Sequence, residues 1–580
     1  MLKRLLQSLR EYKRITILTP IIIIGEVVME CIIPLIIGNL VNNISAGCGL
    51  DVILKSGVVL LIMAGLSLLC GGLAGYTCST AACGFAKNLR KDIFYKVQEF
   101  SFENIDRFST ASLVTRMTTD IMNVQMAFMM SIRMAVRAPL MFLFSVIMAF
   151  FYGGMLAMIF VVVVPILVFV LAMIIKQAMP LFHKVFKKYD NLNNSIQENV
   201  KSMRVVKSFV REEYEKEKFS TAAEDVCKDF TKAERILAFH APTMQFCLYA
   251  VMIFVLYFGA YFVITTKGVQ VNVGQISALL TYGFQILMSL MMISMVFVMI
   301  TMSVESANRI VEVLDDESTI KNPEKPVYEV ADGSIDFEGV NFKYSKKASK
   351  NALSDIDLHI RSGETIGIIG GTGSSKSSLI QLISRLYDAT EGVVKVGGID
   401  VKDYDLETLR NQVAVVLQKN VLFSGTIKEN LQWGNKEATD EEIMEACQLA
   451  QADEFIQRFP DKYDTYIEQG GANVSGGQKQ RLCIARALLK KPKILILDDS
   501  TSAVDTKTDA LIRQGFGKFI PETTKIIIAQ RISSVQDSDR IIVMNGGKIN
   551  GIGTHEELLA NNSIYREVYE SQNKAGEEDA

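Results

Sequence analysis

Six long hydrophobic stretches limit what this chain can fold into. Each is long enough to cross a bilayer as a helix, for which about 20 mostly apolar residues suffice. All six lie in the first 302 residues of a chain that is 49% apolar, and the remainder is typical of a soluble α/β protein. We therefore predict an α-helical membrane domain with six spans, followed by an α/β domain. The spans are expected at about 15–40, 52–75, 132–152, 154–175, 243–264 and 275–302.

Basic residues are distributed unevenly around these stretches. Five precede the first stretch and many more lie in the long segments after the second and fourth, whereas the short connections hold only Lys267. Because basic residues favour the cytoplasmic side of a membrane, we expect both termini to be cytoplasmic and the protein to lie in a bacterial cell membrane. The net charge of −2, with no basic patch among aromatic residues, gives no indication of nucleic-acid binding.

Residues 1–14 are basic and amphipathic, which predicts an interfacial helix before the first span. The first apolar stretch is too long for a cleaved signal and lacks a small-residue cleavage site, so we expect it to remain as a span. The nine cysteines are scattered without C-x-x-C spacing, and this pattern supports neither a disulfide framework nor a zinc site.

Two polar segments separate the second span from the third and the fourth from the fifth. Helical periodicity through Asn88–Gln98 and Asn191–Lys207 predicts that the spans extend as rods beyond the membrane, although solvated loops are the simpler alternative. Each pair of rods needs a turn at its tip, and the candidates are Ser101–Ser109 and Lys207–Glu213. Charged tips with aromatic residues suit docking onto another domain.

Charged residues inside the spans are rare and costly, so each suggests a function. Glu26 and Glu30 stand four residues apart in the first span, as do Arg133 and Arg137 at the start of the third, so each pair shares a helix face. The glutamates could line a substrate pathway. Alternatively, acidic and basic groups pair with each other, or the arginines reach the interface.

A methionine stripe runs along the sixth span at three- and four-residue steps. Methionine is flexible and polarizable, so such a stripe could contact substrates of many shapes, although plain packing or lipid contact explains it as well. Its members are Met288, Met291, Met292, Met295, Met299 and Met302.

A domain boundary is predicted after the sixth span. A polar helix over Glu305–Asp316 should end before the prolines at 323 and 326. We expect the membrane domain over 15–320, a linker over 321–333 and the soluble domain over 334–580. Strands are predicted around Ser334–Phe337, Val340–Tyr344 and Asp357–Ile360.

The strongest functional signal is a loop of small residues between the apolar run Thr365–Ile369 and a helical pattern. Such a strand–loop–helix unit directs backbone N–H groups, a helix N-terminus and a lysine at one point, which suits phosphate binding. Lys376 would contact the β- and γ-phosphates and Ser377 would bind Mg²⁺. Ser375 stands where the pattern has glycine, so a chance loop is the alternative. The loop comprises Gly370, Gly371, Thr372, Gly373, Ser374, Ser375, Lys376, Ser377 and Ser378.

Other residues that could bind a nucleotide lie before and after this loop in the sequence. Tyr344 could stack on an adenine ring, and Gln418 ends the apolar run Val413–Leu417, where its amide could reach Mg²⁺ or water. Asp498 and Asp499 end an apolar strand, and the end of such a strand is where a carboxylate that holds Mg²⁺ is expected. A second anion site is predicted at a helix start made of Ser475, Gly476, Gly477 and Gln478.

Together these motifs resemble the ATP-binding-cassette (ABC) exporters, specifically half-transporters with six spans before a P-loop nucleotide-binding domain with a helical subdomain. The resemblance covers nearly the whole chain and implies ATP and Mg²⁺ as ligands. It implies that Gly370–Ser378 is the Walker A loop, Gln418 the Q-loop glutamine and Ser475–Gln478 the signature. It further implies that Asp498 is the Walker B aspartate, Asp505 the D-loop aspartate and Tyr344 the adenine-stacking residue.

The resemblance also implies that two nucleotide-binding domains close head to tail on two ATP molecules. Each ATP lies between one domain's Walker motifs and the other's signature, and closure alternates the cavity between inward- and outward-facing states.

Departures from the family pattern concentrate on one side of this arrangement. Asp499 replaces the usual catalytic glutamate, Gln530 the switch histidine, Ser375 a glycine and Gln469 a glutamate, while the signature is intact. We expect a degenerate ATP site within a heterodimeric exporter of amphipathic, drug-like molecules. The alternatives are a homodimer with two slow sites, a lipid or peptide exporter, and an ATP-binding membrane regulator.

Overall fold

The computed structural model describes residues 1–580 except 267–268, 270, 346–347, 501–503 and 579–580. The chain divides into two compact units. The membrane unit comprises Met1–Gln98 and Thr110–Asp316, and the nucleotide-binding unit comprises Glu99–Ser109 and Glu317–Ala580.

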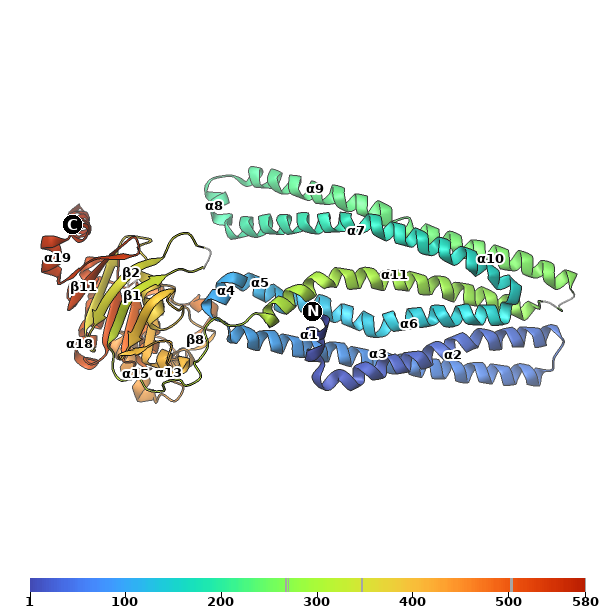
Figure 1. The fold of residues 1–580 in the computed structure, drawn as a ribbon, viewed down its shortest axis with the longest axis horizontal. Coiled ribbons are helices and arrows are strands. Elements are labelled where there is room, and N and C mark those ends of the chain that lie inside the picture. The colour runs from blue at the N-terminus through green and yellow to red at the C-terminus, as the bar shows by residue number, and fades with distance from the viewer. Residues whose placement is uncertain (267–268, 270, 346–347, 501–503, 579–580) are drawn as a thin grey trace. The chain divides into compact units, whose positions relative to one another are not determined.

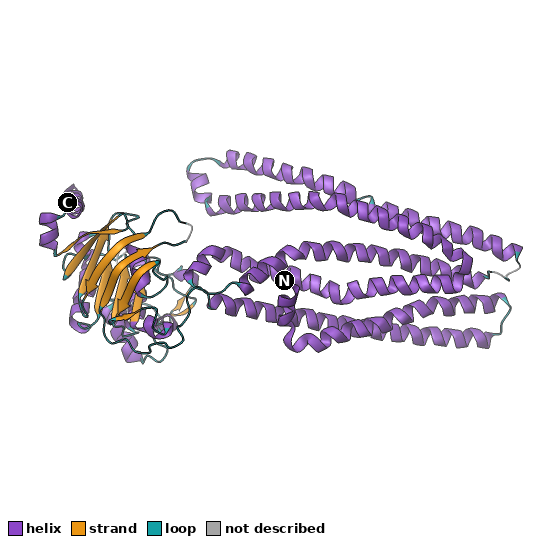
Figure 2. Ribbon diagram, in the orientation of Figure 1, coloured by secondary structure: helices purple, strands orange, loops and turns teal. Residues whose placement is uncertain are grey.

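The membrane unit consists of long helices joined by short turns (Figures 1 and 2). Its described helices are α1 (Leu2–Leu6), η1 (Gln7–Tyr12), α2 (Lys13–Ser45), α3 (Leu50–Gln98), α5 (Thr110–Thr115), η2 (Arg116–Asp120), α6 (Ile121–Gly153), η3 (Gly154–Ala157), α7 (Met158–Lys201), α8 (Met203–Ser208), α9 (Glu212–Leu237), α10 (His240–Thr265) and α11 (Val273–Asp315).

The predicted helical membrane domain is confirmed, and the six apolar stretches fall in α2, α3, α6, α7, α10 and α11. Within the described residues, five continuous helical stretches are long and apolar enough to cross a membrane. Six apolar stretches give five continuous helical stretches because Thr110–Phe182 counts as one, although it contains α6 and the first part of α7. These two helices are distinct, since Gly154 adopts a φ of 52° between them, a conformation that glycine tolerates at little cost.

The predicted rods are helical, and the two tips differ: the first is a short helix, whereas the second turns at 209–211 between α8 and α9, and the two fall in different units. α3 continues to Gln98, and α7 continues to Lys201 before the short α8 and the long α9. The residues of the first tip form α4 (Phe102–Phe108) within the nucleotide-binding unit. Ser101 caps this helix reciprocally with Asn104, and the Asn104 side chain also donates to the Glu317 carbonyl at 3.0 Å.

The core of the nucleotide-binding unit is a six-stranded sheet in the order β12-β11-β3-β10-β9-β6. β3 runs parallel to β10 and β11, and β9 runs parallel to β10 and β6, so these strands all end at one edge. In open α/β sheets that edge is where ligands bind. The strands are β3 (Thr365–Gly370), β6 (Val413–Val416), β9 (Ile494–Asp498), β10 (Thr524–Ile528), β11 (Arg540–Asn545) and β12 (Lys548–Gly553).

A second, four-stranded sheet has the order β2-β1-β4-β5, and β7 pairs separately with β8. The two strands predicted around Ser334–Phe337 and Val340–Tyr344 are one strand, β1, with a register shift between Phe337 and Val340. Gly339 lies inside this bulge at a φ of 58°, so the strand continues past a residue that sequence alone marks as a break. The strands are β1 (Ile335–Phe342), β2 (Leu353–Ile360), β4 (Glu391–Val396), β5 (Ile399–Asp400), β7 (Gly425–Thr426) and β8 (Tyr466–Ile467).

Helices surround these sheets. Besides α4 they are α12 (Lys376–Ile383), α13 (Leu406–Gln412), α14 (Ile427–Leu431), α15 (Asp440–Leu449), α16 (Asp453–Ile456), η4 (Lys462–Asp464), η5 (Gln469–Gly471), α17 (Gly476–Leu488), α18 (Thr506–Phe519), η6 (Ile532–Ser534), α19 (His555–Asn561) and α20 (Ser563–Glu578).

Candidate functional site: the nucleotide-binding site

The phosphate loop follows β3 at the centre of the six-stranded sheet and leads into α12. Gly370 must be glycine, because a β-carbon there would collide with the carbonyl oxygen of Met544. Gly373 and Ser375 adopt left-handed conformations, with φ of 81° and 69°. This conformation suits Gly373 but costs a residue with a β-carbon roughly 1–2 kcal/mol. The backbone of the loop therefore adopts the predicted strand–loop–helix path, although the left-handed conformation is unfavourable for Ser375.

Lys376 folds back over the loop at the start of α12. Its Nζ donates hydrogen bonds to the carbonyl oxygens of Gly370, at 2.8 Å, and Gly371, at 3.0 Å. Burial lowers the pKa of Lys376, and the nearby carboxylates of Asp498 and Asp499 oppose that shift. An anionic phosphate at this position would offset the desolvation of the ammonium group more fully than neutral carbonyls do.

Asp498 is buried at the end of β9, next to the parallel strands β10 and β6. Burial raises its pKa, the Ser377 hydroxyl opposes this by hydrogen bonding, and the charge of Asp499 adds to the increase. A buried carboxylate beside a hydroxyl provides two oxygen ligands of the kind that Mg²⁺ prefers. The described residues contain no cluster of three His, Cys, Asp or Glu side chains that could hold a metal. Ser377 and Asp498 are thus the residues here that could hold Mg²⁺.

Asp499 brings two glutamines together at the same edge of the sheet. Its Oδ2 accepts hydrogen bonds from Nε2 of Gln530 at 2.9 Å and from Nε2 of Gln418 at 3.3 Å. Its backbone has a φ of 48°, and its N–H donates to the Ile528 carbonyl at the end of β10. The three side chains that the sequence predicts for catalysis thus meet at one carboxylate oxygen.

Tyr344 lies beside the loop and is 44% exposed. Its hydroxyl forms hydrogen bonds with the Ser378 hydroxyl at 2.8 Å and with Oε1 of Gln381 at 3.1 Å. Its ring contacts Tyr387 edge to face, with the centroids 5.2 Å apart. The ring is thus fixed at both ends and remains open to solvent, which suits stacking on a base.

The signature forms the start of α17. Ser475 caps this helix, because its Oγ accepts from the Gln478 N–H at 3.3 Å while Oε1 of Gln478 accepts from the Ser475 N–H at 2.9 Å. Ser475 and Gly476 are exposed. Among the described residues, no hydrogen bond joins these four residues to the phosphate loop. The cap uses the N–H groups of Ser475 and Gln478, so the N–H groups of Gly476 and Gly477 in the first helical turn are available to an external anion.

The other positions singled out in the sequence are structural within this chain. Gln469 begins the short helix η5, and Asp505 caps α18 by accepting the Thr508 N–H at 2.9 Å. Ser502 and Ala503, which precede Asp505 in the D-loop, lie outside the described residues.

Sequence reasoning missed Gln572, which lies in the C-terminal helix α20. Its Oε1 accepts the Ile532 N–H at 2.9 Å, and its Nε2 donates to the Gln530 carbonyl at 2.7 Å. One side chain thus holds the backbone on both sides of Arg531, directly beside the switch residue. No spacing or motif marks this position, because the contact joins residues about 40 positions apart in the chain.

Sequence reasoning also missed Tyr387, which connects Tyr344 with α4 inside the nucleotide-binding unit. Its hydroxyl donates to Oδ2 of Asp106 at 2.5 Å, and its ring lies 6.1 Å from that of Phe102. Burial and this hydrogen bond both raise the pKa of Tyr387. Tyr344, the residue predicted to stack on adenine, is therefore two contacts away from α4.

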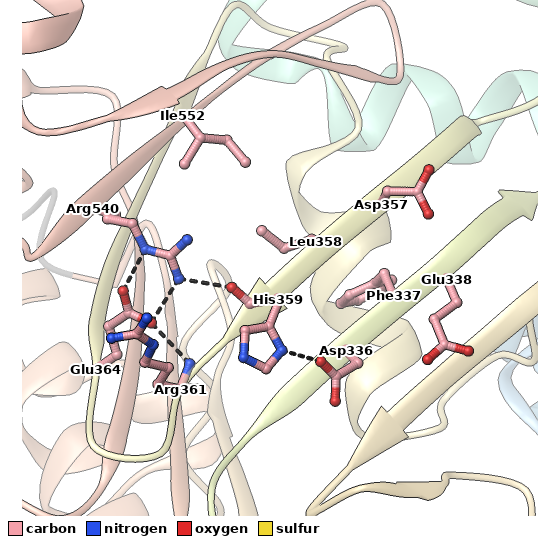
Figure 3. Close-up of a pocket in the computed structure, with 10 residues that line it drawn as sticks. All are labelled: Asp336, Phe337, Glu338, Asp357, Leu358, His359, Arg361, Glu364, Arg540 and Ile552. Atoms are coloured by element: carbon pink, nitrogen blue, oxygen red, sulfur yellow. Dashed lines mark hydrogen bonds and ion pairs between the residues drawn. The ribbon is translucent and has the colours of Figure 1, made fainter.

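A separate hollow of about 600 Å³ lies beside β1 and β2 (Figure 3). Two pairs of its charged residues bind each other: Arg540 forms a two-pronged bond with Glu364, and Nδ1 of His359 contacts Asp336. Burial would raise the pKa of Glu364, but Arg540 and the Arg361 N–H hold it below its usual value. These pairs connect strands, and we assign the hollow no ligand.

In the membrane unit, the two glutamates of the first span share one arginine. Nη1 of Arg137 lies 2.9 Å from Oε1 of Glu26, and Nη2 lies 2.7 Å from Oε1 of Glu30. The Glu26 side chain is only 6% exposed, whereas that of Glu30 is 25% exposed. The pairing favours a structural role for Glu26 and leaves part of Glu30 accessible.

The methionine stripe of α11 does not share one environment. Met288 and Met295 are exposed, at 36% and 64%, while Met299 is half-buried. Met291 packs against the core shared by α6, α7, α10 and α11. The stripe thus divides between packing and open surface.

Comparison with known proteins agrees with this geometry. Residues 16–302 match the family of ABC transporter transmembrane regions, and residues 353–502 match the ABC transporter family. The chain is 34% identical to the ABC transporter ATP-binding protein YfiB of Bacillus subtilis, over 98% of each chain. It is 35% identical to the ABC transporter ATP-binding protein Rv1273c of Mycobacterium tuberculosis, over 99% of this chain and 98% of the relative.

The same fold occurs in a solved structure of a bacterial Atm1-family ABC exporter with ATP bound. The two chains superpose with a TM-score of 0.83 over 97% of this chain and 99% of the other, at 23% identity. This chain therefore belongs to the ABC transporters, as a half-transporter that joins an exporter-type membrane domain to an ATP-binding domain.

Proposed function

We propose that this chain is one half of a heterodimeric exporter in which its own Walker site binds Mg·ATP but hydrolyses it slowly. Its signature completes the second ATP site, which lies on the Walker motifs of the other subunit and turns over. The proposal also assigns a role to each residue of the Walker site. Lys376 and the phosphate loop bind the phosphates, and Tyr344 stacks on the adenine ring. Ser377, Gln418 and Asp498 bind Mg²⁺.

The observation that carries this proposal is the environment of Asp499. Its side chain is one methylene shorter than glutamate, and Oδ2 already accepts two amide hydrogen bonds, from Gln418 and Gln530. A general base must reach the water from which it takes a proton, and misplacement by about 1 Å can cost 10²-fold in rate. Gln530 has no group that can become a cation, so it cannot replace a histidine near developing charge.

The intact signature argues against the homodimer. In a homodimer both sites would combine a good signature with an impaired base, and the signature would serve no fast reaction. A heterodimer gives the exposed N–H groups at the start of α17 a productive partner. That partner is expected to carry glutamate and histidine at the two catalytic positions and an altered signature.

The purified chain tests this proposal directly. We expect the chain alone to bind Mg·ATP and to hydrolyse it barely above background. Asp499→Glu combined with Gln530→His should raise the rate by at least about tenfold, because the base and the switch regain their reach and charge. Robust turnover of the unmodified chain that Lys376→Ala abolishes would exclude a degenerate site.

For the substrate, we propose amphipathic, drug-like molecules, exported from the cytoplasm with both termini on the cytoplasmic side. The exposed Met288 and Met295, with the half-buried Met299, offer an adaptable surface. The partly accessible Glu30, which shares the Arg137 guanidinium with Glu26, offers a negative charge. Glu30→Gln should then weaken the transport of cationic dyes more than that of neutral substrates.

Equal loss for both types of substrate would favour a purely structural role for the Glu26–Arg137–Glu30 cluster. A flux assay in vesicles with the purified heterodimer also separates transport from the second candidate, an ATP-binding regulator. A regulator would bind nucleotide and move no substrate.

A further inference from the structure

A groove of about 320 Å³ lies between the N-terminal segment and the first turns of α2. Leu6, Leu9 and Ile17 give it apolar walls, and Lys3 and Lys13 supply two cations. Gln7 and Thr16 also line it, but Oε1 of Gln7 accepts a hydrogen bond from Nη1 of Arg4 at 2.7 Å, and the Thr16 hydroxyl donates to the Tyr12 carbonyl at 2.9 Å. The groove therefore combines hydrocarbon surface with positive charge and little other polarity.

The N-terminal segment is held firmly enough to maintain this shape. Arg10 adopts a φ of 39°, which kinks the chain within η1, before α2 begins at Lys13. The Ser8 hydroxyl donates to Oδ2 of Asp92 at 2.6 Å, and the Asn88 side chain donates to the Ser8 carbonyl at 3.0 Å. Because Leu9 is also buried, the segment packs against α3 as an ordered wall.

The cations of this segment differ in their partners. Arg4 pairs with Asp315 at 2.9 Å, and Arg10 pairs with Asp92. Lys3 and Lys13 are exposed and form no ion pair with any described residue. Two of the five cations in residues 1–14 thus stabilise the fold, and the two that line the groove, Lys3 and Lys13, are free for an external anion.

The groove also lies at a polarity boundary, because the apolar run of the first span begins directly after Lys13 and Arg14. A soluble anion would leave the apolar walls unused, and a neutral lipid would leave both ammonium groups unused. A ligand that satisfies both features has an anionic head and a hydrocarbon tail, and such molecules concentrate at this boundary.

We propose that this groove binds an anionic phospholipid. The phosphate lies between the ammonium groups of Lys3 and Lys13, and an acyl chain lies against Leu6, Leu9 and Ile17. Since Arg4 in the same segment also contacts the Leu314 carbonyl at the end of α11, a bound lipid would brace the N-terminal segment against that helix.

Native mass spectrometry of the purified full chain, without nucleotide, tests this proposal. We expect phosphatidylglycerol to bind more tightly than phosphatidylcholine with the same acyl chains. Lys3→Gln with Lys13→Gln should weaken phosphatidylglycerol binding about 30-fold, since each lysine near a membrane surface contributes about a factor of five. The matched control, Lys91→Gln with Lys176→Gln, removes the same charge elsewhere and should change binding less than about twofold.

Equal binding of the two lipids, or equal loss in both double variants, would overturn the proposal. Inorganic phosphate and glycerol phosphate distinguish a lipid from a free phosphate, because neither should displace phosphatidylglycerol if the acyl chain contributes. Displacement by inorganic phosphate would assign the lysines to a soluble anion and contradict the lipid site. Circular dichroism of the variants checks that the helices remain folded, and Lys13→Arg, which keeps the charge, should retain binding.

Discussion

The Walker side and the signature side of the nucleotide-binding unit differ in how closely they follow the ABC pattern. On the Walker side, Ser375 takes a strained left-handed conformation, and Asp499 shares one oxygen between two glutamines. On the signature side, Ser475 and Gln478 form a complete reciprocal cap, and the helix start is exposed. The same domain thus carries one altered and one unaltered half of an ATP site.

From this difference we expect nucleotide binding and nucleotide hydrolysis to depend on separable features. The loop, the buried Asp498 and the Ser377 hydroxyl depend on the parallel sheet, which is intact. Hydrolysis depends on the reach and charge of single side chains at the edge of that sheet. Substitutions there can remove the chemistry and leave the fold and the phosphate cradle in place.

The largest expected effect contrasts one mutation on each side. In the heterodimer, Ser475→Arg should lower ATPase activity about 10²-fold, because it removes a donor and adds a bulky cation where charge develops during phosphoryl transfer. Lys376→Ala should cost well under that, since it acts on the site that we propose to turn over little. Steady-state ATPase assays of the two variants measure the contrast.

Two outcomes would contradict the proposed assignment of the two ATP sites. If both variants were equally inactive, both sites would hydrolyse in obligatory alternation. If Ser475→Arg stayed active and Lys376→Ala lost activity, the competent and degenerate sites would be the reverse of those proposed. ATP binding to each variant, measured separately, shows whether a loss lies in binding or in turnover.

A smaller effect is expected at Gln572, which holds the backbone next to Gln530 on the Walker side. In the chain restored by Asp499→Glu and Gln530→His, Gln572→Leu should lower kcat on the order of tenfold and leave the KM for ATP nearly unchanged, because it releases the backbone beside the switch. Gln572→Glu keeps the acceptor for the Ile532 N–H and loses the donor, so it should be intermediate.

Ser571→Ala, at the adjacent exposed position of α20, serves as the matched control. A rise in KM with unchanged kcat, or loss of thermal stability without a change in kcat, would indicate that Gln572 only stabilises the fold.

The smallest expected effect concerns the strain at Ser375. Ser375→Gly should stabilise the nucleotide-binding unit by about 1 kcal/mol, because glycine adopts the left-handed conformation without a penalty from a β-carbon. Thermal melting with and without Mg·ATP measures this change. Ser375→Ala keeps the β-carbon and should give no stabilisation; a gain equal to that of glycine would show that the loop is unstrained.

The helical membrane domain, the α/β domain and the phosphate loop can all be predicted from the sequence. These features depend on local properties: long apolar runs require helices in a bilayer, and small residues before a lysine permit a phosphate loop. The same reasoning divided β1 into two strands, because a glycine bulge resembles a turn until its partner strands β2 and β4 are known.

Which side chains meet in the sites depends on the three-dimensional fold and could not be predicted from the sequence. Asp499 joins Gln530, 31 positions away, and Gln418, 81 positions away, because β10 and β6 flank β9 in the sheet. Arg137 holds Glu26 and Glu30 across more than 100 residues, and Gln572 reaches the switch from the last helix. No local pattern specifies such pairs, since they depend on sheet order and helix packing, which arise from the sum of many distant contacts.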